Sequence, residues 1–201
     1  MRDACEVIGV ARRMVTAMAR LRGPKSVQVS LNLPVLQISG TWEPNDDERK
    51  AAWELYVELV TRISVVPLGP GEGLLREALS SLYSLFATTR DILRRYGPGV
   101  AEPKPGGQYS FGTLAVAMLN IGLRPMLARW HPALEDWEAG RPERLSRGEH
   151  ERAWDRAGDL RAALETTRDL LTQYARLMAS ACGVPDLLEE VVVPQRSGTG
   201  G

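Results

Sequence analysis

Apolar residues recur every three or four positions along most of this chain of 201 residues, which is the pattern of amphipathic helices. In two stretches the spacing alternates strictly between four and three, which is typical of the buried seam of a bundle helix. The pattern predicts helices over residues 4–22, 45–66, 75–96, 110–137 and 146–183. The two seams consist of Leu75, Leu79, Leu82, Phe86, Thr89, Leu93 and Tyr96, and of Ala153, Ala157, Leu160, Leu164, Thr167, Leu171, Tyr174, Met178 and Ala181.

Two helix starts carry a capping box, in which a polar side chain and a glutamate three residues later satisfy each other's backbone amides. These pairs are Asn45 with Glu48 and Ser146 with Glu149, and Gly183 marks the end of the last helix. The second pair predicts that the last helix starts at 146 and runs on without a break.

The helix predicted over 110–137 contains two prolines. Proline removes an amide donor and clashes with the preceding turn, so Pro125 should kink this helix. We expect the helix to restart near Pro132 and to reach Trp137.

Between the first two helices the hydrophobic period changes from helical spacing to alternation. Val27, Val29 and Leu31 alternate with polar residues, and Leu36 and Ile38 repeat the alternation after a short turn. This pattern predicts a β-hairpin, which needs a packing surface to be stable.

A near-repeat relates residues 85–96 to residues 163–174, since both contain Thr-Thr-Arg-Asp at the same helical register. We therefore predict an all-α fold, an antiparallel four-helix bundle over 45–183 built from two related helical hairpins. The N-terminal helix and hairpin (1–44) would form an extension, and the tail (184–201) should be disordered at its end. An extended solenoid is the alternative, although two repeats are too few to stand alone.

Composition narrows the class of protein. The chain has 44% hydrophobic and 25% charged residues, as soluble globular proteins do, and 25 basic residues balance 25 acidic ones. Because basic residues do not outnumber acidic ones, the composition gives no strong indication of nucleic-acid binding. Cys5 and Cys182 form neither a disulfide framework nor a zinc cluster, and the most apolar segment, 111–123, is too short for a transmembrane segment. We expect a cytoplasmic protein.

The repeated Thr-Thr-Arg-Asp offers a first candidate site. In both copies the second threonine lies on the seam, and its hydroxyl is expected to bond back to its own helix while the arginine stem covers the core edge. The alternative brings Arg90 and Arg168 together across a pseudo-two-fold axis, where they would bind an anion or a partner.

The segment from Arg124 to Pro132 is the most unusual local sequence and contains a histidine between tryptophan and proline. Arg124 precedes His131 by seven positions, and this pair in an all-helical domain resembles the motif of the HEPN ribonucleases. The resemblance implies metal-independent RNA cleavage by the pair at a dimer interface. Pro125 departs from the polar residue usual after the arginine in that family, and Arg144 with His150 offers a second match of similar spacing.

The structural interpretation of the same segment is that Trp130 and Trp137 anchor the kinked helix while His131 bonds locally. Both tryptophans are also candidate binding residues. No metal site or cofactor motif can be assembled from the two histidines and two cysteines. The sequence thus favours a protein that is not an enzyme.

Three functions remain open at this point. The first is a non-catalytic interaction or regulatory module that binds a protein partner or associates with itself. The second is a HEPN-like ribonuclease that uses Arg124 and His131. The third is peripheral membrane binding through the helix at 4–22, whose arginines would meet anionic lipid.

Overall fold

The structure, a computed structural model, describes residues 23–62 and 72–190. This part of the chain is mostly helical and contains one two-stranded antiparallel sheet. The predicted helix at 4–22, with its proposed membrane contact, and the end of the tail lie outside the described residues. The main elements are β1 (Val27–Leu33), β2 (Leu36–Trp42), α2 (Asp46–Val60), α3 (Leu75–Tyr96), α4 (Phe111–Ala117), the π-helical η3 (Met118–Leu123), α5 (Arg124–Ala139), α6 (Arg147–Arg152), α7 (Ala157–Cys182) and α8 (Leu187–Glu190). Two short 3-10 turns, η1 (Gly97–Val100) and η2 (Pro105–Gly107), lie between α3 and α4.

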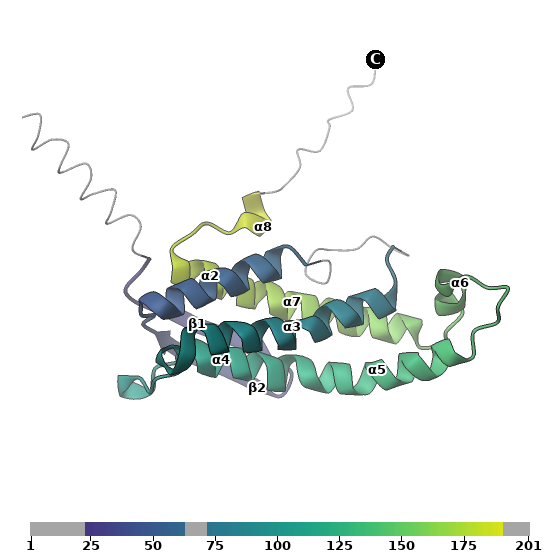
Figure 1. The fold of residues 1–201 in the computed structure, drawn as a ribbon, viewed down its shortest axis with the longest axis horizontal. Helices are drawn as coiled ribbons and strands as arrows, with labels where there is room; N and C mark the ends of the chain where they lie inside the picture. Colours follow the sequence, from purple (N-terminus) through teal and green to yellow (C-terminus); the bar gives the residue numbers. More distant parts are fainter. Residues whose placement is uncertain (1–22, 63–71, 191–201) are drawn as a thin grey trace, which may run out of the picture.

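The long helices run along the length of the molecule, with α2 packed on α7 and α3 beside α5 (Figure 1). The sheet covers one end of this helical layer, where β1 contacts α7 and η3. Val29 and Leu31 of β1 are buried in the same apolar core as the helices. The mostly helical class with one hairpin is therefore confirmed, while the antiparallel bundle of two related hairpins stays a prediction.

The predicted hairpin forms, with Ile38 of β2 buried as the alternation indicates but Leu36 exposed beside the turn. Its strands pair from Val27 with Trp42 to Leu33 with Leu36, and the side chains of β1 alternate between buried and exposed. The hairpin is stable here because its buried face packs on the helices, as a two-stranded sheet requires.

The fourth predicted helix does not break at its prolines. It continues from Phe111 to Ala139, because the π-helical turn η3 absorbs the disturbance ahead of Pro125. The amide of Arg124 bonds to the carbonyl of Leu119, five residues back, and Pro125 falls in the first turn of α5, where proline is tolerated. The predicted restart near Pro132 is wrong, since Pro132 lies inside α5.

This continuous helix also revises an expectation drawn from segment 111–123 alone. Phe111–Ala139 is long and apolar enough to cross a membrane by length and composition. Half of its most apolar stretch is buried inside the protein, and core helices pass the same test.

The last helix is broken where the sequence pattern predicts continuity. The capping box of Ser146 and Glu149 is confirmed, but it starts only the short helix α6, and α7 begins at Ala157. The break occurs because the Trp154 side chain is buried against other tryptophans, so the chain turns to bring it inward. Ala153, a predicted seam position, is exposed.

The carboxylate of Glu48 ties four segments together at the sheet end of the molecule. Besides closing the predicted capping box with Asn45, it accepts hydrogen bonds from Trp42 Nε1 at 3.3 Å and from the Phe111 amide at 2.9 Å. Lys104 Nζ lies 2.5 Å from Oε2. Glu48 is fully buried, so these donors replace the water that an ionised carboxylate needs.

The seam of α3 is only partly covered. Its N-terminal half is buried as predicted, but Phe86 and Leu93 are only half-buried, and Leu85 and Ile92 take the buried positions instead. The apolar stripe of α3 is therefore wider than the surface that its neighbours cover. The uncovered part faces α4 and α5.

Candidate binding groove

The uncovered stripe of α3 lines a groove between α3 and the continuous helix of α4, η3 and α5. Two adjoining hollows of about 620 and 890 Å³ form it, and both include Leu93, Val116 and Asn120. We call it the α3–α5 groove. Its lining residues are Tyr83, Phe86, Arg90, Leu93, Gly97, Pro98, Ala101, Gly112, Thr113, Val116, Ala117, Leu119, Asn120, Ile121, Arg124, Leu127, Ala128, His131 and Pro132.

Helical periodicity places these side chains along one line on each wall. On α3 the residues Tyr83, Phe86, Arg90 and Leu93 recur every three or four positions, and the opposite wall repeats this spacing from Val116 onward. The two walls run in opposite directions (Figure 1), and the π-helical turn contributes Asn120. Such turns are found frequently at functional sites.

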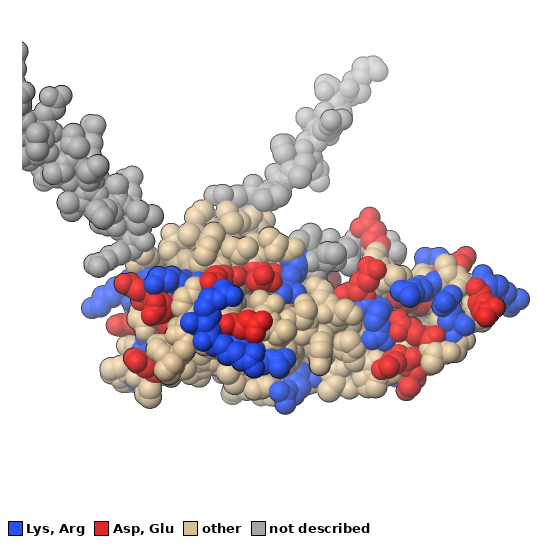
Figure 2. Space-filling model, in the orientation of Figure 1, with Lys and Arg blue, Asp and Glu red and all other residues tan. Residues whose placement is uncertain are grey.

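The groove is apolar along its floor and cationic at its middle. None of its lining residues is aspartate or glutamate. The Arg90 Nε donates to the Phe86 carbonyl at 2.9 Å, and its guanidinium is not in an ion pair with any described residue. The exposed Arg124 side chain has neither a hydrogen bond nor an ion pair within the described chain. In Figure 2 an uncharged band of surface separates two regions where charged side chains gather.

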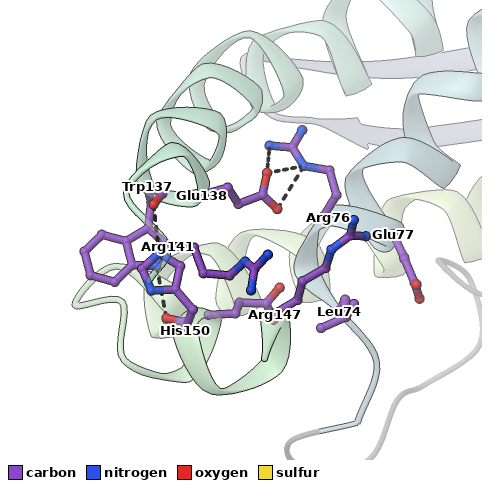
Figure 3. A pocket seen from close by; sticks show the side chains of 9 residues that line it. Leu74, Arg76, Glu77, Trp137, Glu138, Arg141, Arg147 and His150 are labelled. Atoms are coloured by element: carbon purple, nitrogen blue, oxygen red, sulfur yellow. Dashed lines mark hydrogen bonds and ion pairs between the residues drawn. The ribbon is translucent and has the colours of Figure 1, made fainter. Parts of the chain in front are cut away.

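His131 lines the groove at the end that it shares with Tyr83. Its Nδ1 lies 3.0 Å from Nη1 of Arg76, which has no acceptor, so Nδ1 must accept and the ring proton must sit on Nε2. Arg76 is fixed in turn by Glu138, whose carboxylate accepts from Nε at 2.9 and 3.2 Å and lies 2.7 Å from Nη2 (Figure 3). The Nε2 of His131 is buried and has no hydrogen-bond partner in the described chain.

A smaller pocket of about 320 Å³ is also lined by Arg76, together with Glu138 and the stacked pair of Trp137 and His150 (Figure 3). The two rings are 4.6 Å apart, His150 Nε2 lies 2.8 Å from the Trp137 carbonyl, and Trp137 Nε1 donates to the His150 carbonyl at 3.0 Å. These bonds occupy His150, so this pocket holds a structural contact between α5 and α6.

The carboxylate of Glu151 lines the same pocket and caps the N-terminus of α3, although it is 76 residues away in sequence. It accepts from the Leu75 amide at 2.8 Å, at a helix start that has no side-chain cap of its own. Burial raises the pKa of Glu151, against the opposing effect of this hydrogen bond. The pocket is therefore part of the packing between α3, α5 and α6.

The structure brings three of the predicted site residues to one place and leaves the others apart. Arg90, Arg124 and His131 all line the α3–α5 groove. Arg168 pairs with Glu165 on α7 and is not among the residues of this groove. The expected bond of a seam threonine back to its own helix is present in the second copy of the repeat, where the buried Thr167 hydroxyl donates to the Ala163 carbonyl at 2.8 Å.

The two candidate tryptophans anchor the end of the molecule. Trp130 is buried, packs edge-on against Trp154, and has the guanidinium groups of Arg129 and Arg156 over its ring at 4.9 and 4.8 Å. Trp137 is bonded to His150 as described. The structural interpretation of this segment therefore fits the contacts of both rings.

Sequence reasoning missed Phe86 and Leu93 as groove residues, because periodicity marks an apolar face without showing what covers it. It also missed Arg76, which lies 55 residues from the histidine that it contacts. In neither case does the local sequence carry a signal.

The chemistry of the groove suits binding better than proton abstraction. A general base needs a free lone pair, whereas His131 offers an N–H on Nε2 and a lone pair already engaged by Arg76. Within the described ranges, no three His, Cys, Asp or Glu side chains gather as a metal site would require. An apolar floor with unneutralised guanidinium groups fits an amphipathic ligand that carries negative charge.

Comparison of this chain with protein families, with curated proteins and with solved structures finds no match.

Proposed function

We propose that this protein is a non-catalytic interaction module that binds an amphipathic helix of a partner protein in the α3–α5 groove. The observation that carries the proposal is an open apolar groove, lined by two arginines and no carboxylate. The four long helical segments, α2, α3, α4–α5 and α7, would act as a rigid bundle that holds the groove open.

The length of the groove favours a helical ligand. It extends along α3 from Tyr83 to Gly97, which at 1.5 Å per residue corresponds to about 20 Å. A partner helix of about 14 residues would fill it, laying its apolar face between the two walls. Tyr83 and Val116 are 61% and 47% exposed, so the bound helix would cover apolar surface that is now in water.

Charge complementarity selects the kind of helix. The two arginines would attract acidic side chains that flank the apolar stripe of the partner, and no carboxylate of the groove would repel them. A basic helix would meet like charge at the middle of the groove. We therefore propose an acidic amphipathic helix as the occupant.

Selection from a displayed peptide library tests this function. The library fixes leucine at helical spacing over about 14 residues and varies the flanking positions among Glu, Gln and Lys. We expect enriched peptides to bind wild-type protein and to lose binding to Val116→Arg, which places a charge in the groove. Val57→Arg is the matched control, because Val57 is an exposed valine on α2 outside the groove.

The proposal would be refuted if no peptide binds the wild-type protein, or if peptides bind Val116→Arg and Val57→Arg equally well. Self-association through the groove is a separate outcome of the same variants. It would appear as a concentration-dependent dimer of the wild type that Val116→Arg abolishes and Val57→Arg retains.

A ribonuclease is the second candidate, and one observation favours it: Arg124 and His131 line the same hollow. The hydrogen bond from Arg76 to His131 disfavours a ribonuclease, because it occupies the ring nitrogen that a general base would use. A cleavage assay on purified protein separates the two functions.

A further inference from the structure

The buried N–H of His131 is an unmet hydrogen-bonding group at one end of the groove. A buried donor without an acceptor is costly, and native proteins rarely leave one unsatisfied. His131 Nε2 has no partner among the described residues, and the Tyr83 ring lies edge-on to the imidazole at 5.5 Å between centroids. A ligand that carries a hydrogen-bond acceptor would therefore satisfy this donor.

The direction of this donor is fixed by the residues behind it. Arg76 can only donate, so its contact with Nδ1 keeps the proton on Nε2, and the ion pair with Glu138 holds Arg76 in place. Arg76 and Glu138 thus orient the His131 imidazole from behind. A ligand acceptor would meet a donor that is already aligned.

Arg124 provides the second contact at a defined spacing. It lies seven residues before His131 in one helix, which puts both side chains on the same face about 10 Å apart along the axis. A partner helix lying along α5 presents residues that are themselves seven apart at the same interval. Two acidic residues with this spacing would meet both positions at once.

We propose that the α3–α5 groove recognises two carboxylates seven residues apart on the bound helix. One accepts the Nε2 proton of His131 after the exposed Tyr83 ring moves aside, and the other pairs with the guanidinium of Arg124. This inference rests on the proposed helix-binding function and names the residues of the partner that the groove selects.

A double-mutant cycle between protein and peptide tests the pairing. The probe is a leucine-patterned helical peptide with glutamates at two positions seven apart, compared with versions that carry glutamine at either position. We expect each Glu→Gln change to weaken binding to wild-type protein about tenfold, equivalent to about 1.4 kcal/mol. His131→Leu should abolish the effect of one glutamate, and Arg124→Gln the effect of the other.

His131→Gln is the control for a merely structural role, because its side-chain amide keeps an N–H donor and should retain part of the glutamate preference. Equal binding of the glutamate and glutamine peptides would overturn the inference while leaving helix binding intact. So would a glutamate preference that survives in His131→Leu and in Arg124→Gln. Loss of binding by all peptides would instead refute the helix-binding function itself.

Discussion

Replacing the carboxylate of Glu48 by an amide should destabilise the protein more than any other conservative change at a described glutamate. Its two oxygens accept from four groups, at 2.5 to 3.3 Å, and none of it is exposed to water. In Glu48→Gln, one oxygen becomes an NH₂ group. Whichever way the amide turns, two donors then face a donor, either Asn45 N–H with Lys104, or Trp42 with Phe111.

The magnitude follows from the loss of a buried charge pair. Removing one partner of such a pair typically costs about 3–5 kcal/mol, and we expect about 3 kcal/mol because one oxygen remains as an acceptor. Urea unfolding followed by circular dichroism measures the change as a lower midpoint at unchanged slope. Glu58→Gln on the same helix is the control, since the Glu58 side chain is 45% exposed and its partner Arg62 keeps three other acceptors, so the change should cost less than about 1 kcal/mol.

A loss below about 1 kcal/mol in Glu48→Gln, equal to that of the control, would refute the reasoning. It would mean that the four donors find water or other acceptors at little cost. The consequence for binding is indirect, because Glu48 holds the first amide of α4 and thereby one wall of the groove.

Catalysis, thiol reactivity and phenol titration give three separate checks. We expect purified protein to leave RNA uncleaved, and cleavage that Arg124→Ala and His131→Ala both abolish would contradict a non-catalytic role. Burial raises the pKa of Cys182 to about 11, so in a Cys5→Ser variant its thiol should react slowly near neutral pH until urea unfolds the protein. Burial raises the pKa of Tyr96 from 10.0 to about 12, so the folded state binds this proton more tightly and stability should fall as pH rises between these values. Urea titrations of wild type and Tyr96→Phe over this range check that difference.

The parts of the fold that could be predicted are those controlled by neighbouring residues. Both capping boxes form because their two members lie in one turn of chain. The hairpin forms, and β1 buries the face that its pattern predicts, because alternation of side chains is a property of the strand itself. The left-handed Gly183 ends α7 for the same kind of local reason.

The parts that failed depend on distant contacts. Pro132 stays inside α5 against the local signal to break the helix. The helix break before α7 accompanies the burial of Trp154 against Trp130, a contact that the local period does not show. Phe86 and Leu93 share the period of core residues but lack a neighbour that covers them. In the candidate site, the placement of Arg124 and His131 on one face could be predicted from their spacing in one helix. The contact of Arg76 with His131 could not, because Arg76 lies on a different helix.

Mapping a bound peptide on the protein by nuclear magnetic resonance tests the central claim most directly. A titration with the leucine-patterned peptide that carries two glutamates should shift signals of the groove, above all those of Tyr83, Leu93, Val116 and His131, and leave the Val57 face of α2 unchanged. Shifts confined to α2 or the hairpin, or no shifts at all, would contradict binding in the α3–α5 groove.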